Sequence, residues 1–108
     1  MTVKELGEKL DLQMLASGDT SQSIASCYIS DLLSRVLGGC KEGDVWITVQ
    51  ASINMVAVAA MTGASCVILP EGLTAAENVI EKASEEGLTV FSSKETAYAL
   101  AAKLAGLL

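Results

Sequence analysis

The sequence predicts an α/β sandwich, with a small, mostly parallel sheet of about four to five strands flanked by helices. Two observations predict it. After residue 40, strand-like and helix-like segments alternate three times, and such alternation builds a parallel sheet with right-handed crossovers. The chain has 108 residues, of which 51% are hydrophobic, which fits one domain over residues 1–108 with enough apolar surface to form a core.

The first residues predict a helix followed by a strand. Thr2 and Glu5 have the spacing of a capping box, in which each side chain satisfies a backbone N–H of the first turn. Apolar residues at helical spacing extend this helix to about Leu10. Residues 12–16 are predicted to form a strand. The polar segment around Gly18 and Asp19 is predicted to be a turn rather than a ligand loop.

A second strand and a second helix complete the first half of the chain. Residues 24–29 are mildly alternating and predict a strand. Ser30 is expected to cap the helix that follows. Gly38 and Gly39 are expected to end it, because glycine adopts the left-handed C-cap conformation without a steric clash.

The second half contains the three strand–helix pairs. The predicted strands are Val45–Val49, Cys66–Leu69 and Leu88–Phe91. The first of them is so apolar that both of its faces should be buried, as in a parallel sheet. The predicted helix N-caps are Ser52, Thr74 and Ser93, residue types that bond the free N–H groups of a first turn. Gly63 and Gly87 are expected to end two of these helices.

Composition excludes several classes of function. Lys and Arg total 7 against 13 for Asp and Glu, so the net charge is −6, and nucleic-acid binding is not expected because it needs clustered positive charge. The chain has no histidine, so no catalytic triad is available. The absence of an apolar stretch of membrane-spanning length and of a signal peptide predicts a cytoplasmic protein with no membrane contact.

The cysteines offer little support for a metal or redox site. Cys27, Cys40 and Cys66 are widely spaced and form no C-x-x-C pair, so no metal site or cofactor is expected. They are interpreted as buried small hydrophobic residues. Cys40 follows two glycines, which leaves a reactive thiol open there. An enzyme or phosphoryl carrier that uses Cys40 or one of the serines is the least favoured of the hypotheses.

Three loops leave the carboxyl ends of the predicted parallel strands, where ligands bind in open α/β sheets. Each leads into a helix N-terminus, whose free N–H groups can hold an anion. The candidate ligand-binding residues in these loops are Gln50, Ser52, Asn54, Glu71, Gly72, Thr74 and Ser93. The alternative is that Ser52, Thr74 and Ser93 are only helix caps.

A homodimer is favoured over a monomer. Residues 53–61 are apolar nearly all round, and such a helix must be covered on every side. Trp46 and the terminal cluster of Leu104, Leu107 and Leu108 add apolar area that a small monomer struggles to bury.

The sequence resembles the DRTGG-domain family over essentially its whole length. The resemblance is carried by the opening Thr2–Leu6, by the loop Gly18–Asp19, and by the segments Asp31–Ser34, Lys41–Gln50, Asn54–Ala59 and Val67–Gly72. It implies a small α/β module, similar to the N-terminal domain of HPr kinase, that occurs alone or attached to metabolic enzymes. It further implies a regulatory or dimerising role without assigned enzymatic activity.

The loops at the strand ends depart from the pattern of the family. Where many members have Thr-Gly-Gly, this sequence has Pro70-Glu71-Gly72, and where members have Asp-Arg, it has Gln50-Ala51-Ser52. Glu71 brings a side chain and a negative charge, which disfavours an anionic ligand. The first hypothesis is a non-enzymatic, homodimeric regulatory module that senses a small molecule at the strand-end loops or contacts a metabolic enzyme. The alternative is a sensor of a nucleotide or metabolite at the strand-end loops.

Overall fold

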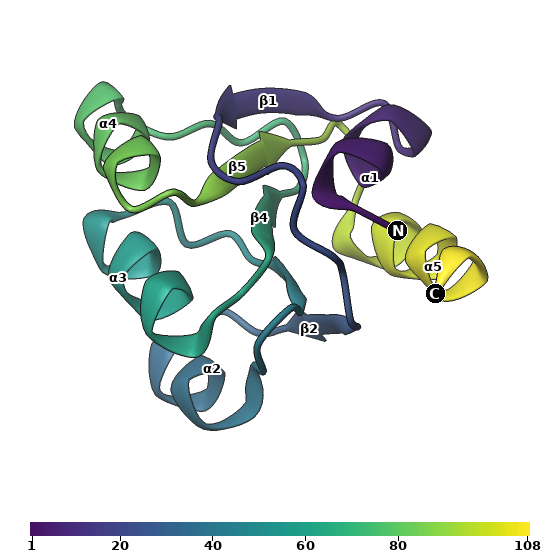
Figure 1. The fold of residues 1–108 in the computed structure, drawn as a ribbon, viewed down its shortest axis with the longest axis horizontal. Coiled ribbons are helices and arrows are strands. Elements are labelled where there is room, and N and C mark those ends of the chain that lie inside the picture. The colour runs from purple at the N-terminus through teal and green to yellow at the C-terminus, as the bar shows by residue number, and fades with distance from the viewer.

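The computed structural model describes all 108 residues as a five-stranded sheet with helices on both faces (Figure 1). The strands are β1 (Gln13–Ala16), β2 (Cys27–Ile29), β3 (Val45–Ile47), β4 (Cys66–Leu69) and β5 (Thr89–Ser92). The helices are α1 (Val3–Lys9), α2 (Leu33–Gly39), α3 (Ile53–Thr62), α4 (Glu77–Glu85) and α5 (Ala97–Leu107). The predicted fold class is confirmed.

The sheet has the order β1-β5-β4-β3-β2. Four strands are parallel, and β1 pairs antiparallel with β5 at one edge. Consecutive parallel strands are neighbours, so the carboxyl ends of β2, β3, β4 and β5 meet at one edge of the sheet. This edge carries the loops that the sequence analysis selected.

Two separate cores lie on the two faces of the sheet. Helices α2, α3 and α4 cover one face, where Trp46, Val67 and Val90 point from the strands. Helices α1 and α5 cover the other, against Val45, Ile68 and other strand residues. Neighbouring positions of one strand thus enter opposite cores, which explains why β3 and β4 are apolar at every position.

Several expected helix ends are confirmed. Thr2 and Glu5 form the capping box of α1. The Ser52 hydroxyl accepts a hydrogen bond from the Met55 N–H at 3.4 Å and caps α3. Gly63 ends α3 in the left-handed conformation, with φ +76°, where glycine has no steric penalty.

Three predicted N-caps are wrong, because each helix begins later than expected. The second helix is capped at Leu32 without a side-chain bond, and the Ser30 hydroxyl instead accepts from the Leu32 N–H at 3.3 Å. Helix α4 is capped at Ala76, also without a side-chain bond, so Thr74 lies outside it. Thr96, rather than Ser93, caps α5. Apolar periodicity predicted the approximate positions of these helices, but the packing of the preceding loops determines the residue at which each helix begins.

The expected role of Gly38 and Gly39 is also wrong. Neither has a positive φ, and both lie within α2, which ends at Cys40 in an extended conformation. Gly39 serves a packing role instead. A Cβ there would lie 2.5 Å from the hydroxyl oxygen of Tyr28, so only glycine lets that ring approach the helix.

Trp46 does not contribute the exposed apolar area that was expected of it. Its side chain is fully buried, and its indole N–H donates to the Ser30 carbonyl at 2.9 Å. Helix α3 buries Met55, Val56, Val58 and Ala59 within the single chain, whereas Ile53 and Met61 stay 39% and 75% exposed. An interface between two copies would therefore use exposed residues of this kind and not Trp46.

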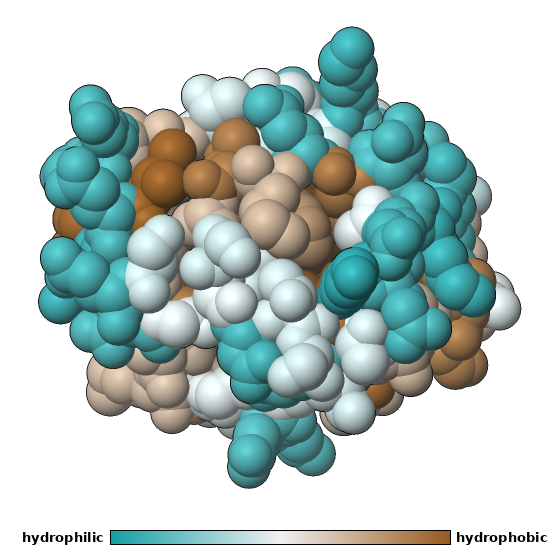
Figure 2. Space-filling model, turned by 45° about the horizontal axis from the view of Figure 1, so that its top comes forward, coloured by the Kyte–Doolittle hydropathy of each residue, from teal (hydrophilic) through white to brown (hydrophobic).

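The polar surface is unevenly distributed. On the face shown in Figure 2, hydrophilic side chains gather over α4 at the left and over α1 at the right, with a band of apolar and weakly polar residues between them. The exposed Met14 of the edge strand β1 is one of the large hydrophobic residues at the surface. No helix has the length and apolar character needed to cross a membrane.

Candidate functional site

The loops after β4 and β5 lie side by side at the carboxyl edge of the sheet. The Glu71 N–H donates to the Glu95 carbonyl at 2.8 Å, and the Gly72 N–H donates to the Ser93 carbonyl at 2.7 Å. Three predicted site residues, Glu71, Gly72 and Ser93, are thus brought together. The convergence of these two loops is the part of the predicted site that the fold assembles.

Gln50 is held in a different group of residues. Its side-chain amide donates to the Asp31 carbonyl at 2.9 Å. The Asp31 carboxylate accepts from the Thr48 hydroxyl and from the Val49 N–H, each at 2.9 Å. Asp31 therefore joins the loop after β2 to the loop after β3. The sequence marked Asp31 only as part of a segment that resembles the family and not as a site residue, because its partners lie some 17 residues further along the chain.

The remaining predicted residues do not reach the convergence of the β4 and β5 loops by any hydrogen bond. Ser52 is occupied as the cap of α3. Asn54 and Thr74 are exposed, and neither side chain makes a hydrogen bond within the protein. For Ser52, the observed hydrogen bond agrees with the alternative that this residue is only a helix cap.

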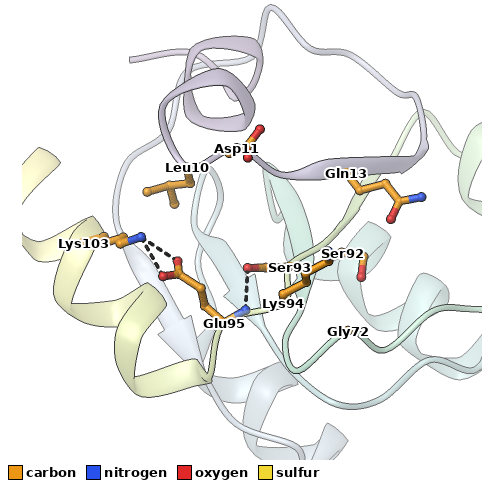
Figure 3. Close-up of a pocket in the computed structure, with 9 residues that line it drawn as sticks. All are labelled: Leu10, Asp11, Gln13, Gly72, Ser92, Ser93, Lys94, Glu95 and Lys103. Atoms are coloured by element: carbon orange, nitrogen blue, oxygen red, sulfur yellow. Dashed lines mark hydrogen bonds and ion pairs between the residues drawn. The ribbon is translucent and has the colours of Figure 1, made fainter.

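A polar pocket with a volume of about 400 Å³ opens beside the β4 and β5 loops (Figure 3). It lies between the turn that follows α1, the end of β5 and Lys103 of α5. Its lining residues are Leu10, Asp11, Gln13, Gly72, Ser92, Ser93, Lys94, Glu95 and Lys103. This volume is within the range of small-ligand sites, about 300–1,000 Å³. Only Gly72 and Ser93 belong to the predicted set.

Two serines at the end of β5 differ in their free hydrogen-bonding capacity. The Ser92 hydroxyl donates to the Leu73 carbonyl at 2.6 Å. The Ser93 hydroxyl accepts from the Glu95 N–H at 3.1 Å and donates to no protein group. Ser93 is 7% exposed, so its hydroxyl is a nearly buried donor at the pocket wall.

Charged groups of both signs line the pocket. Lys103 pairs with both carboxylate oxygens of Glu95, at 2.7 and 2.8 Å, and Figure 3 shows this pair closing one side. The Lys94 ammonium and the Asp11 carboxylate have no partner in the protein. The pocket thus contains one internal ion pair and one unpaired charge of each sign.

The backbone beside the pocket has two unusual conformations. Asp11 (φ +51°) and Glu71 (φ +60°) are the only residues other than glycine with positive φ. Such conformations cost about 1–3 kcal/mol and concentrate at functional sites. Asp11 lines the pocket, and Glu71 precedes Gly72, which also lines it.

Sequence reasoning missed the pocket residues from the N-terminal half, because it considered only the loops after parallel strands. Asp11 and Gln13 reach the pocket because β1 pairs antiparallel with β5, which places Gln13 opposite Ser92. A parallel β1 would have placed its first residues at the other edge of the sheet. The direction of this edge strand is not encoded in its own four residues.

The three cysteines are not placed for nucleophilic chemistry. Burial raises the pKa of the Cys66 thiol to about 12 and that of Cys27 to about 11. Burial likewise raises the pKa of Cys40. Since the thiolate is the reactive form, these environments disfavour it, Cys40 included.

The raised pKa values of the buried thiols predict that the domain loses stability at alkaline pH. In the unfolded chain a thiol ionises near its ordinary pKa of about 8.5, whereas folding raises the pKa of Cys66 to about 12. This stabilisation is complete below pH 8.5 and is lost as the pH rises toward 12. Between pH 7 and pH 10, Cys66 should account for a loss of about 2 kcal/mol.

Urea denaturation of the wild type and of Cys66→Ala, each at pH 7 and at pH 10, measures the contribution of Cys66 to this loss of stability. The variant should lose about 2 kcal/mol less than the wild type between pH 7 and pH 10. The other ionisable groups are common to the two proteins, so the difference between their losses isolates the contribution of Cys66. Equal losses in the two proteins would show that Cys66 does not contribute.

Comparison with known families identifies the family to which the chain belongs. The family model described as the DRTGG domain matches residues 5–107. The chain belongs to the DRTGG-domain family. The match spans all ten helices and strands except the first residues of α1, so the resemblance seen in the sequence is confirmed.

A solved structure supports the fold of this DRTGG domain. The chain is similar to the crystal structure of the CBS and DRTGG domains of the regulatory region of Clostridium perfringens pyrophosphatase, complexed with its activator diadenosine tetraphosphate. The TM-score is 0.72 at 15% sequence identity, over 95% of this chain and 45% of that chain. The present chain thus spans less than half of that regulatory region. No curated protein matches the sequence.

The DRTGG domain of that pyrophosphatase belongs to its regulatory region, which fits the regulatory role that the sequence favours for the present chain. The geometry also explains a departure from the family pattern. Residues 71 and 72 both adopt positive φ, which is the conformation that paired glycines favour. Glu71, at the position of the first glycine of Thr-Gly-Gly, adopts this conformation at a conformational cost.

Proposed function

We propose that this DRTGG domain is a non-enzymatic regulatory module that acts as a homodimer and contacts a metabolic enzyme. The observation that carries the proposal is an apolar groove between the edge strand β2 and α5. It has a volume of about 500 Å³ and is lined by Ala25, Ser26, Cys27, Ile29, Ala101, Leu104, Ala105 and Leu108. Seven of these eight residues are hydrophobic.

The outer face of α5 extends this apolar surface. The helix contains one charged residue, Lys103, among its 11 residues. Tyr98 is 85% exposed, and Leu108 is 49% exposed. Apolar area of this kind marks interaction sites. A second copy fits this face because no acidic side chain lines the groove, so two chains of charge −6 meet here without bringing acidic side chains together.

The edge of the sheet is further evidence that a second copy of this chain binds at the groove. Strand β2 is the last strand in the sheet order, so one side of it presents unpaired backbone groups, which are ready to associate with another chain. The exposed Ile29 lies on this strand. Two copies related by a twofold axis would place the α5 faces and the groove rims together in one interface.

A charged substitution in the groove tests the dimer. Ala105 is an exposed residue of α5 that lines the groove, so Ala105→Glu should leave the monomer folded. Buried at an interface, the new carboxylate would cost about 2–5 kcal/mol, which weakens dimerisation at least about 30-fold. Sedimentation equilibrium of the wild type and the variant measures the dissociation constant.

Met61→Glu is the matched control, because Met61 is 75% exposed on α3, on the opposite face of the sheet. It should dimerise as the wild type does. If Met61→Glu dissociates the dimer and Ala105→Glu does not, the interface lies on α3. A wild type that stays monomeric at high micromolar concentration overturns the dimer itself.

A second function is favoured by the polar pocket, namely the sensing of a small molecule. In the proposed sensor, Glu71, Gly72 and Ser93 belong to the ligand site, and Gln50, Ser52, Asn54 and Thr74 shape the adjoining edge. The neighbouring pyrophosphatase region is complexed with a nucleotide activator, but it also contains CBS domains. The ligand of the present domain is therefore argued from its own pocket.

A further inference from the structure

The polar pocket has a charge pattern that selects for one class of small molecule. Asp11 and Lys94 offer one unpaired charge of each sign, and the Glu95–Lys103 pair is internally neutralised. The lining is therefore neutral overall, in a chain whose net charge is −6. A ligand that carries a positive and a negative group can satisfy both free charges.

Ligands with charge of one sign fit less well. An inorganic phosphate at Lys94 would also face the unpaired carboxylate of Asp11. A simple amine at Asp11 would also face the unpaired ammonium of Lys94. In each case the like-charge approach opposes the favourable contact, whereas a zwitterion places each of its charges beside its opposite.

Size and polarity narrow the class further. Of the nine lining residues only Leu10 is hydrophobic, so the pocket suits a ligand without a large apolar side chain. Its volume of about 400 Å³ admits a small metabolite. The nearly buried Ser93 hydroxyl is a free donor, and Gln13 makes no side-chain hydrogen bond in the protein.

We propose that this pocket binds a small, polar zwitterion of the α-amino acid class. Its ammonium group contacts the Asp11 carboxylate, and its carboxylate accepts from the Lys94 ammonium and the Ser93 hydroxyl. The left-handed turn at Asp11 holds that carboxylate at the pocket after α1 has ended. This inference rests on the sensor function proposed above and specifies its ligand.

Titration followed by ¹H–¹⁵N correlation spectra tests the proposal. The probes are the free polar α-amino acids, together with inorganic phosphate, acetate, methylammonium and adenosine nucleotides. We expect one or more amino acids to shift the amide signals of Asp11, Gly72 and residues 92–95 in a saturable manner. The deaminated and the decarboxylated analogues of that amino acid should each bind at least about tenfold more weakly.

Two pairs of variants test the residues. Asp11→Asn removes the charge but keeps a residue that tolerates positive φ, and Lys94→Gln removes the free ammonium. Each should weaken binding at least about tenfold. The controls, Glu81→Gln and Lys41→Gln, remove exposed charges outside the pocket and should leave the affinity unchanged.

The outcomes separate this inference from the broader sensor function. Saturable binding of phosphate or a nucleotide at the pocket, without binding of any amino acid, keeps the sensor but overturns the zwitterionic class. An amino acid whose affinity is unchanged in Asp11→Asn and Lys94→Gln overturns the assigned contacts. No saturable shift with any probe overturns both proposals. The analogues test the two charges on the wild type, so a misfolded variant does not leave the result open.

Discussion

Gly18→Ala is expected to destabilise the domain by about 3 kcal/mol. Gly18 lies in the loop after β1 and packs against the turn that leads into β5. A Cβ at this position would lie 2.1 Å from the Gly87 carbonyl oxygen and 2.6 Å from the carbonyl carbon of Leu88. Both obstacles are backbone atoms, so no side-chain rotation can relieve the clash.

The contacts around Gly18 explain why the loop cannot easily move away. The Gly18 N–H donates to the Thr89 hydroxyl at 3.0 Å, and the Asp19 N–H donates to the Gly87 carbonyl at 3.1 Å. Moving the loop would break both bonds at the edge where β1 joins the sheet. Urea denaturation monitored by circular dichroism measures the loss.

Gly38→Ala is the matched control for this substitution. Gly38 lies inside α2, and a Cβ there would have no neighbour within 4 Å. Alanine favours the helix by about 0.5–1 kcal/mol over glycine, so this variant should be slightly more stable than the wild type. If Gly18→Ala is as stable as Gly38→Ala, the close approach of the two loops does not occur.

Trp46→Ala is expected to cost about 3–5 kcal/mol, the usual range for removing a large buried aromatic residue. Small domains have a total stability of about 5–15 kcal/mol, so the loss would be a large part of it. Trp46 is the largest fully buried side chain and lies in the core beneath α2 and α3. Its loss would also leave the Ser30 carbonyl without its indole partner.

Denaturation of Trp46→Ala should be compared with that of two further variants. Trp46→Phe keeps an aromatic ring and removes the hydrogen bond, so its loss should be smaller. Tyr98→Ala removes an aromatic residue that is 85% exposed, and it should change the stability of the monomer by less than about 0.5 kcal/mol. A Trp46→Ala loss as small as that of Tyr98→Ala would contradict the burial of Trp46.

The sequence indicated the edge of the sheet where the loops after β4 and β5 meet, but it did not indicate all of the residues that line the pocket there. The parallel arrangement of β3, β4 and β5 could be inferred from alternating segments alone, and it places Gly72 and Ser93 together. Asp11, Gln13 and Lys103 could not be inferred. They reach the pocket only through the antiparallel pairing of β1 and the packing of α5 across the sheet. Sequence distance gives no signal for such contacts.

The choice of helix caps shows the same limit on a smaller scale. Ser52 and Ser93 both follow a parallel strand, yet only Ser52 caps its helix. The Ser93 carbonyl and N–H are bonded to Gly72 and Leu69, which holds this residue at the end of β4 and β5 and delays the start of α5 to Thr96. Local preference alone treats the two serines as equivalent.

The sequence by itself determined the fold class, because hydrophobic periodicity is a property of each segment and states which faces must be buried. It also determined the family, through a pattern spread over the whole chain. Only the tertiary structure decided the direction of β1, the burial of Trp46 and the positions of the unpaired charges of Asp11 and Lys94. The physical reason is that these features depend on contacts between segments that are distant in the chain. The energy of such a contact cannot be inferred from either segment alone.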